Sequence, residues 1–182
     1  ALNVSSNNPL TVPNNSSLLS SISVPEPKKL PQLKTVAVLT VVSSEPPANS
    51  FRPPYVGTDK TSYFTKNSIR PDKIPTFAPV PDMIGIDVVK SRFEKPWLDH
   101  VPSWLGRYMH PVGNLPNYGS DIAKYVNEGI LRMMISDSID AKMPALINIL
   151  QAGIDFHGIL NNGGKWPEDG GHMVGRLPLL TF

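Results

Sequence analysis

The chain contains no cysteine. Disulfide bridges, thiolate nucleophiles and cysteine metal sites are therefore excluded. Its basic residues are dispersed, with no run longer than Lys28-Lys29, and the formal net charge is only +2, so the electrostatic footprint of a nucleic-acid-binding protein is missing. No apolar run is long enough to span a bilayer. We therefore expect no nucleic-acid partner and no membrane span.

Proline, by contrast, is abundant and unevenly distributed. The 182 residues include 20 prolines, roughly double the usual share, and most of them precede residue 117. Most of the helical periodicity follows that position. A chain of this length is normally one domain or two small ones. It opens on Ala-Leu-Asn-Val-Ser, which is neither a start methionine nor a signal peptide, so we expect a processed product or an incomplete fragment.

Residues 1–44 are predicted to be β-rich. Residues 18–24 and 35–42 are rich in β-branched side chains and are separated by Asn, Ser and Pro, which predicts two or three strands. The second run is apolar at nearly every position, as is typical of a strand covered on both faces. So few strands can hardly make such a sheet. We therefore expect some of the neighbouring strands to be missing from this chain.

Residues 45–116 are dominated by proline. Each proline fixes its own φ and favours extended backbone in the residue before it, which predicts an ordered or semi-ordered strap that runs over a surface. The expected anchors are the aromatic residues Phe51, Tyr55, Tyr63, Phe64 and Phe77. A short helix is predicted over residues 86–93. We interpret Trp97 and Trp104 mainly as packing residues.

Residues 117–182 carry the helical periodicity. Apolar residues recur every three or four positions from residue 120 or 121 to residue 134, which predicts one amphipathic helix. A second helix is predicted from residues 138–140 to residue 160, with Pro144 in its first turns, where proline is tolerated. The short connection predicts an antiparallel helical hairpin, and residues 177–182 begin a further apolar element. The fold class is therefore α+β.

A functional site is expected in residues 151–176. This stretch gathers polar, aromatic and ionisable side chains around two glycine pairs, directly after the most strongly helical segment. No signature of fixed spacing for phosphate, zinc or nucleotide chemistry is present. His157 and His172 match no zinc pattern with their neighbouring carboxylates, and calcium loops are absent. We expect neither a metal site nor a cofactor.

The two histidines of this stretch are the candidate catalytic residues. Because histidine titrates near neutrality, His157 could act as a general acid or base. Asn161, four residues later, shares its helix face, whereas Asp155 points elsewhere. The alternative for His157 is a hydrogen-bonded histidine at a helix end. His172 follows Gly170-Gly171, a backbone that could approach a ligand closely or could be purely structural.

Trp166, Arg176 and Asn161 are the candidate substrate-binding residues. The indole face of Trp166 could cover the apolar side of a pyranose; the alternative is a packed loop anchor. Arg176 could hold a carboxylate or sulfate as a fork, or it could be structural. Glu168 and Asp169 are adjacent and cannot flank one bond as a paired acid and base. We interpret them as a solvated turn.

Several motifs prompt a family resemblance. They are Phe51-Arg-Pro-Pro-Tyr-Val-Gly-Thr-Asp-Lys60, Arg92-Phe-Glu-Lys-Pro-Trp-Leu-Asp-His100, Asn117-Tyr-Gly-Ser-Asp-Ile122, Gly153-Ile-Asp-Phe-His-Gly-Ile159, the Gly-Gly-His172 turn and Gly-Arg176. Together they resemble larger, uncharacterised bacterial proteins thought to be exported, which have a β-rich N-terminal part followed by helical hairpins, similar to α/α-toroid polysaccharide lyases and hydrolases. The resemblance implies that this chain is the middle of such a protein, and it assigns no catalytic residue.

Two functions follow as hypotheses. The first is an exported polysaccharide-binding or polysaccharide-processing protein, extracellular, periplasmic or at the cell surface, that takes an acidic glycan. The alternative is a structural or interaction component of an extracellular or cell-surface assembly, without catalytic activity. Its partners would be other protein chains that cover the incomplete core. A virion component is a third class that nothing specific favours.

Overall fold

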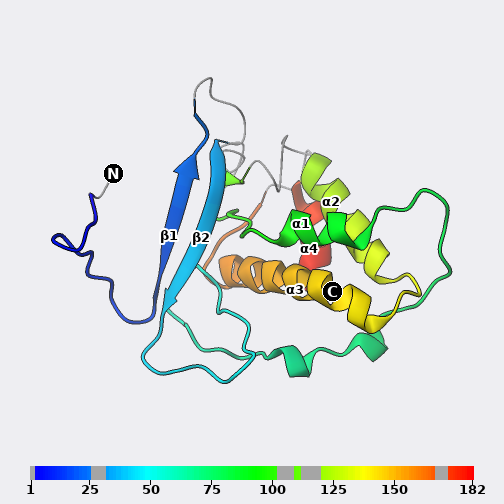
Figure 1. Cartoon of the computed structure of the whole chain (residues 1–182), viewed down its shortest axis with the longest axis horizontal. Helices are drawn as coiled ribbons and strands as arrows, with labels where there is room; N and C mark the ends of the chain where they lie inside the picture. The colour runs from blue at the N-terminus through cyan, green and yellow to red at the C-terminus, as the bar shows by residue number, and fades with distance from the viewer. Residues whose placement is uncertain (1–2, 26–31, 102–108, 112–119, 167–171) are drawn as a thin grey trace.

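The computed structural model describes residues 3–25, 32–101, 109–111, 120–166 and 172–182, and of Ser120 and His172 only the backbone (Figure 1). The expected α+β class is confirmed, because a two-stranded antiparallel sheet lies beside a group of helices. The described elements are β1 (Ser16–Ser23), β2 (Leu33–Val41), the 3-10 helices Lys66–Ser68 and Pro71–Lys73, α1 (Ile86–Phe93), α2 (Ser120–Met133), α3 (Ile139–Asn161) and α4 (His172–Thr181).

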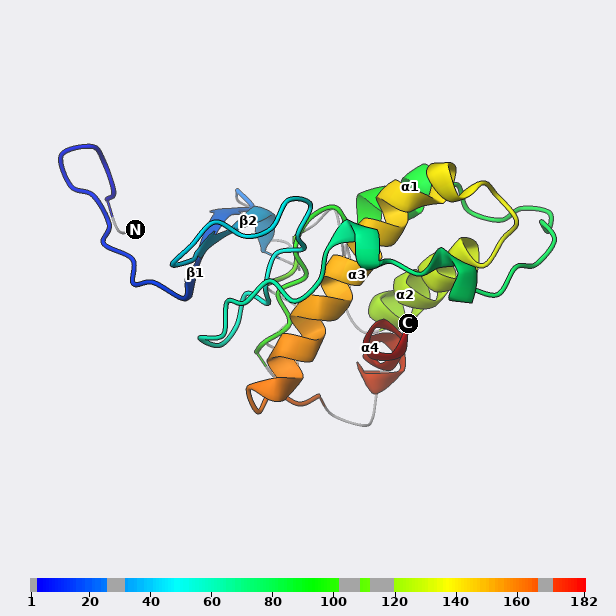
Figure 2. The ribbon, with the colours of Figure 1, turned by 90° about the horizontal axis from the view of Figure 1, so that it is seen from below.

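The β1–β2 hairpin lies at one side of the helical part (Figures 1 and 2). Both strands were expected from the β-branched runs, and both are confirmed within two residues. One face of the hairpin packs on the core through Leu19, Val36 and Val38. On the other face Ile22 and Leu39 are each 58% exposed. Among the described residues, therefore, no second layer covers the apolar outer face of β2.

The core lies between the helices and is rich in aromatic rings. Phe93 and Trp97 stack with their ring centroids 4.9 Å apart, and Trp97 meets Phe156 edge to face at 6.4 Å. Trp97 is 1% exposed, so its interpretation as a packing residue is confirmed, whereas Trp104 lies outside the described residues. Burial of large aromatic surfaces of this kind dominates core energetics.

α1, α2 and α3 begin and end close to the predicted positions, whereas α4 begins five residues before the apolar element expected over residues 177–182. The helices also do not pair as expected. Ser138 caps α3 by accepting a hydrogen bond from the backbone N–H of Ala141, and the helix continues through Pro144. Lys142 donates to the carbonyl oxygens of Met133 and Ile135 at 3.0 and 2.9 Å, which satisfies the end of α2. α2 nevertheless packs mainly on α4, and α3 mainly on α1. The reason is that α3 is apolar on several faces.

The apolar character of α3 has a second consequence. By length and composition this helix could cross a membrane, although 44% of its most apolar 18-residue stretch is buried inside the structure. The buried core helix of a soluble protein can have the same length and composition. The absence of a membrane span stays a prediction.

Candidate functional site

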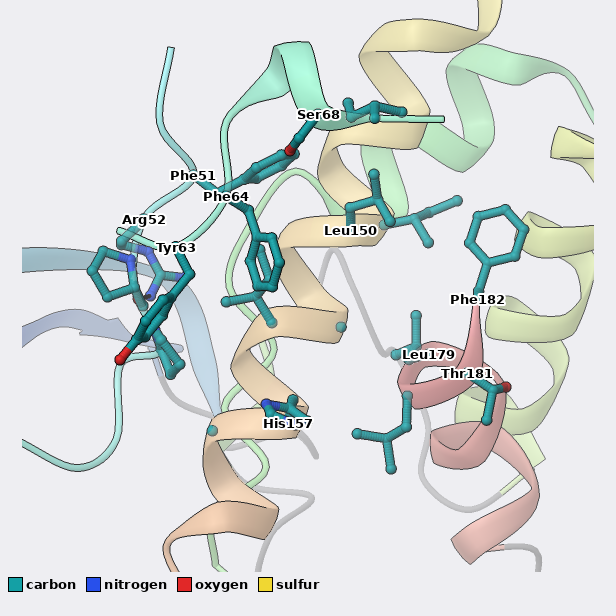
Figure 3. A pocket seen from close by; sticks show the side chains of 18 of the residues that line it. Phe51, Arg52, Tyr63, Phe64, Ser68, Leu150, His157, Leu179, Thr181 and Phe182 are labelled. Carbon is teal, nitrogen blue, oxygen red and sulfur yellow. Dashed lines mark hydrogen bonds between the residues drawn. The ribbon is translucent and has the colours of Figure 1, made fainter. Parts of the chain in front are cut away.

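A groove with a volume of about 1050 Å³ runs between residues 51–75, α3 and the end of α4 (Figure 3). Its walls are mainly apolar, with Leu150 on α3 and Leu179 and Phe182 opposite (Figure 3). A few hydrogen-bonding side chains line it as well. Concave, largely apolar sites with a small number of polar groups are the usual form of ligand-binding sites. This groove is the candidate functional site.

One wall of the groove is held on α3 by two polar side chains of that helix. Gln151 forms two hydrogen bonds with the backbone of Arg52, each at 3.0 Å. The Arg52 guanidinium binds both oxygens of Asp155 at 2.9 and 2.5 Å, and the backbone N–H of Tyr55 donates to Asp155 at 3.1 Å. Burial raises the pKa of the Asp155 carboxyl, whereas the charge and hydrogen bonds of Arg52 oppose this shift.

The same wall approaches α3 very closely one turn later. A Cβ added at Gly158 would lie 2.1 Å from the Cβ of Pro54, so only glycine fits there. Lys60 closes the loop by donating from Nζ to the carbonyl oxygens of Pro54 and Val56 at 2.6 and 3.1 Å. Because residues 151, 155 and 158 share one helix face, residues 51–60 follow that face.

The five aromatic residues expected to anchor the proline-rich segment divide into two groups. Phe51 and Tyr55 are 6% and 5% exposed and do anchor it. Tyr63, Phe64 and Phe77 are 68%, 55% and 56% exposed, so the expectation is wrong for these three. Tyr63 and Phe64 line the groove, with ring centroids 6.5 Å apart, whereas Phe77 does not line it.

His157 and Asn161 lie together on the α3 side of the groove. Both side chains are exposed, and Asn161 Nδ2 donates to His157 Nδ1 at 3.2 Å, as their spacing predicts. With Nδ1 accepting, the neutral ring carries its proton on Nε2. Tyr63 donates from its hydroxyl to Asp59 Oδ2 at 2.8 Å, and both of these residues also line the groove.

The other two predicted substrate-binding residues do not line the groove. Trp166 is 7% exposed and Arg176 is 2% exposed. Trp166 Nε1 donates to the carbonyl oxygen of Asp99 at 3.1 Å. Arg176 donates to the Asp99 carboxylate from Nε and from Nη2, the latter at 3.0 Å. These inward contacts correspond to the structural alternatives, because an arginine buried this deeply needs a carboxylate partner.

His172 begins α4, but its side chain lies outside the described part of the structure. Glu168, Asp169 and Gly170-Gly171 lie outside it altogether. The second candidate catalytic residue therefore stays a prediction.

Sequence reasoning missed a buried polar cluster around Asp99. The Asp99 cluster comprises Asp99, Arg176, His110, Tyr55 and His100. His110 Nε2 lies 3.3 Å from Asp99 Oδ1. The backbone N–H of Asp99 donates to the Tyr55 hydroxyl at 3.0 Å, and that hydroxyl lies 3.2 Å from His100 Nδ1. No local pattern could have shown it, because its members are spread from residue 55 to residue 176.

Burial governs the ionisation of the Asp99 cluster. Burial would raise the pKa of Asp99, but hydrogen bonds and charge from His110 and Arg176 outweigh it and lower the pKa below the ordinary range. Burial raises the pKa of Tyr55 and lowers that of His100, which the Asp99 charge partly opposes. Asp99 and His110 are 1% and 0% exposed. These two side chains therefore act on the fold and are not offered to a ligand.

Neither similarity to known proteins nor a metal site in the described part of the chain identifies a function for the groove. Among the described residues, no group of three or more His, Asp or Glu side chains could hold a metal ion. No protein-family model matches this chain, and no curated protein or solved structure matches it either.

Proposed function

We propose that this chain binds an acidic polysaccharide in the groove between residues 51–75, α3 and α4. The observation that carries the proposal is the pairing of two exposed aromatic rings, Tyr63 and Phe64, with the hydrogen-bonded His157 and Asn161 pair in one groove. Aromatic faces cover the apolar side of a pyranose ring. Amide and imidazole groups supply donors and acceptors for its hydroxyls.

One lysine in the groove, Lys73, supports an acidic ligand. Arg52, Arg70 and Lys73 line the groove, against one lining side-chain carboxylate among the described residues, Asp59. Arg52 and Arg70 are paired with Asp155 and Asp72. Lys73 has no ion-pair partner among the described residues, and an ammonium group of this kind could bind a uronic acid carboxylate. Export to the periplasm, cell surface or medium is part of the proposal, since such glycans are found there.

Binding is better supported than processing. The common glycosidase mechanism needs two carboxyl groups that flank the scissile bond, and Asp59 is the sole side-chain carboxylate among the described lining residues. A lyase-like reaction needs proton abstraction. His157 could act as its base only through Nδ1, which would first have to release the hydrogen bond from Asn161. His157→Ala should then abolish turnover of a uronic acid polymer while glycan binding is retained. Turnover that persists in this variant would remove His157 from the mechanism.

The binding test compares aromatic residues inside and outside the groove. Isothermal titration with a uronic acid polymer, and with neutral dextran as the comparison, should show binding of the acidic polymer alone. Tyr63→Ala and Phe64→Ala should each weaken it about tenfold, from the loss of an aromatic contact worth roughly 1 kcal/mol or more. Phe77→Ala is the matched control, because Phe77 is equally exposed but lies outside the groove. Equal effects at Phe64 and Phe77, or no binding of any polymer, would refute the proposal.

The alternative function, an interaction component of an extracellular or cell-surface assembly, is favoured by a different observation. The outer face of the hairpin exposes the apolar side chains of Ile22 and Leu39, which another protein chain would cover in an assembly. The two functions use different surfaces of the chain. They can therefore be tested separately.

A further inference from the structure

β1 has an outer edge with which no strand of the described part of the chain pairs. β2 pairs with β1 along its other side. Figure 1 shows β2 between β1 and the helices, so the outer edge faces away from the helical part. The backbone N–H and C=O groups of such an edge are a template for another strand. The occupant that fits this edge is an extended strand.

β1 lacks the devices by which proteins usually protect an edge. Charged residues, prolines and bulges along the strand discourage pairing with another chain. The β1 sequence Ser-Ser-Leu-Leu-Ser-Ser-Ile-Ser contains no charge and no proline, and its one irregularity lies at its end, between Ile22 and Ser23. A two-stranded sheet is also marginal on its own. Addition of strands would stabilise it.

We propose that β1 pairs antiparallel with β1 of a second copy of this chain, about a two-fold axis at Ser20, to give a four-stranded sheet. A two-fold axis perpendicular to the sheet keeps each side chain on its own face, so opposing residues must lie on the same face. Centred on Ser20, the strand is self-complementary: Leu18 lies opposite Ile22 of the second copy, and Ile22 opposite Leu18. Centred on Leu19, Leu18 would lie opposite a serine instead.

This register also joins the exposed apolar side chains of the outer face. Within the hairpin Leu18 lies opposite Leu39, and Ile22 opposite Thr35. Across four strands the row would run from Leu39 and Leu18 to Ile22 and Thr35 of the second copy. Neighbouring apolar side chains on one sheet face stabilise strand pairing. The side chains that are 58% exposed in one copy thus become members of two continuous rows.

The absence of cysteine makes disulfide trapping a clean test. In the proposed register residue 20 lies directly opposite its counterpart, about 4.5–5.5 Å between Cα atoms, which is within the range that a disulfide spans. Ser16→Cys is the matched control, because Ser16 shares the strand and the face of Ser20. Its counterpart would be about 27 Å away, eight residues along the sheet. On oxidation we expect Ser20→Cys to give at least about tenfold more covalent dimer than Ser16→Cys, because paired strands raise the effective thiol concentration.

A second variant tests the outer-face pairs. Ile22→Lys places a charge beside Leu18 of the second copy, at a position already exposed to solvent, so the fold of one copy should survive. In the Ser20→Cys background it should reduce trapping to the Ser16→Cys level. Leu131→Lys, on α2 and 61% exposed, should leave trapping unchanged. Circular dichroism checks that each variant is folded.

Sedimentation of the unmodified chain gives an independent readout. We expect a weak dimer whose population rises with concentration and falls in the Ile22→Lys variant. Equal trapping at residues 16 and 20 would overturn the register. A monomer at every concentration, with no excess of trapped Ser20→Cys dimer, would overturn self-pairing and leave the edge to a strand of another protein or to none. Neither result bears on glycan binding in the groove.

Discussion

Replacement of Asp99 by asparagine should be among the most destabilising substitutions of similar size in this chain. The Asp99 carboxylate is 1% exposed and accepts hydrogen bonds from Arg176, with His110 within 3.3 Å. Asparagine keeps the volume but removes the negative charge and turns two acceptor sites into donors. Arg176, itself 2% exposed, then faces an N–H group. The buried positive charge loses its carboxylate.

The expected cost follows from the burial of both partners. Removal of one member of a buried ion pair costs about 3–5 kcal/mol, and we expect the lower end, near 3 kcal/mol, because one amide oxygen can still accept. Domains are stable by only about 5–15 kcal/mol. With a urea dependence of about 1–3 kcal/mol per molar, the unfolding midpoint should fall by about 1–3 M.

Urea unfolding followed by circular dichroism measures this shift directly. Asp72→Asn is the matched control, because Asp72 forms the same kind of bidentate pair with Arg70 but is 55% exposed, and exposed pairs contribute little. The lowered pKa of Asp99 means that its contribution is complete above its ordinary pKa of about 3.9 and is lost as pH falls through the lowered value. The difference between wild type and Asp99→Asn should therefore shrink below about pH 4. Equal midpoints for Asp99→Asn and Asp72→Asn would refute the buried pair.

Two further predictions concern His100 and the contact of residues 51–60 with α3. Burial lowers the pKa of His100, so the contribution of the neutral ring to stability is complete above about pH 6.5 and is lost as pH falls through the lowered value. His100→Gln should therefore flatten the acid side of the melting-temperature profile between about pH 7 and 5. An unchanged profile would contradict this. Gly158→Ala should lower the free energy of unfolding in urea by about 1–3 kcal/mol, because the added methyl group clashes with Pro54. Gly85→Ala is the control and should be tolerated, since nothing lies within 4 Å of a Cβ there. Equal effects would contradict the close approach of Pro54 to α3.

The elements of the fold were predictable because their causes are local. The helix over residues 86–93 and the start of α2 follow from apolar spacing, and the start of α3 follows from apolar spacing and the Ser138 cap. The partners of those helices were not predictable, because α3 is apolar on several faces and its sequence does not say which face meets which neighbour. The short connection from α2 to α3 favoured a hairpin, but in the structure α2 packs mainly on α4 and α3 mainly on α1.

In the candidate site, too, local contacts were predictable from the sequence and contacts between distant residues were not. His157 and Asn161 were predicted to converge because they are one helical turn apart, and they do. Trp166 and Arg176 turn inward because Asp99, far earlier in the chain, supplies the carbonyl and carboxylate that they bind. Composition alone also could not tell that Tyr55 is buried while Tyr63 is exposed.

Residues 51–60 connect the groove to the Asp99 cluster, and this constrains how binding can be tested. The backbone N–H of Tyr55 donates to Asp155, which also binds Arg52 of the groove wall, and the Tyr55 hydroxyl accepts from the N–H of Asp99. A substitution in the Asp99 cluster would therefore disturb the groove wall as well as the core, and a loss of glycan binding there would not identify a ligand contact. Tyr63 and Phe64 are exposed and line the groove without belonging to that cluster. Their variants separate binding from stability, so a loss of affinity at these two positions, with an unchanged urea midpoint, is the result that would assign the groove its ligand.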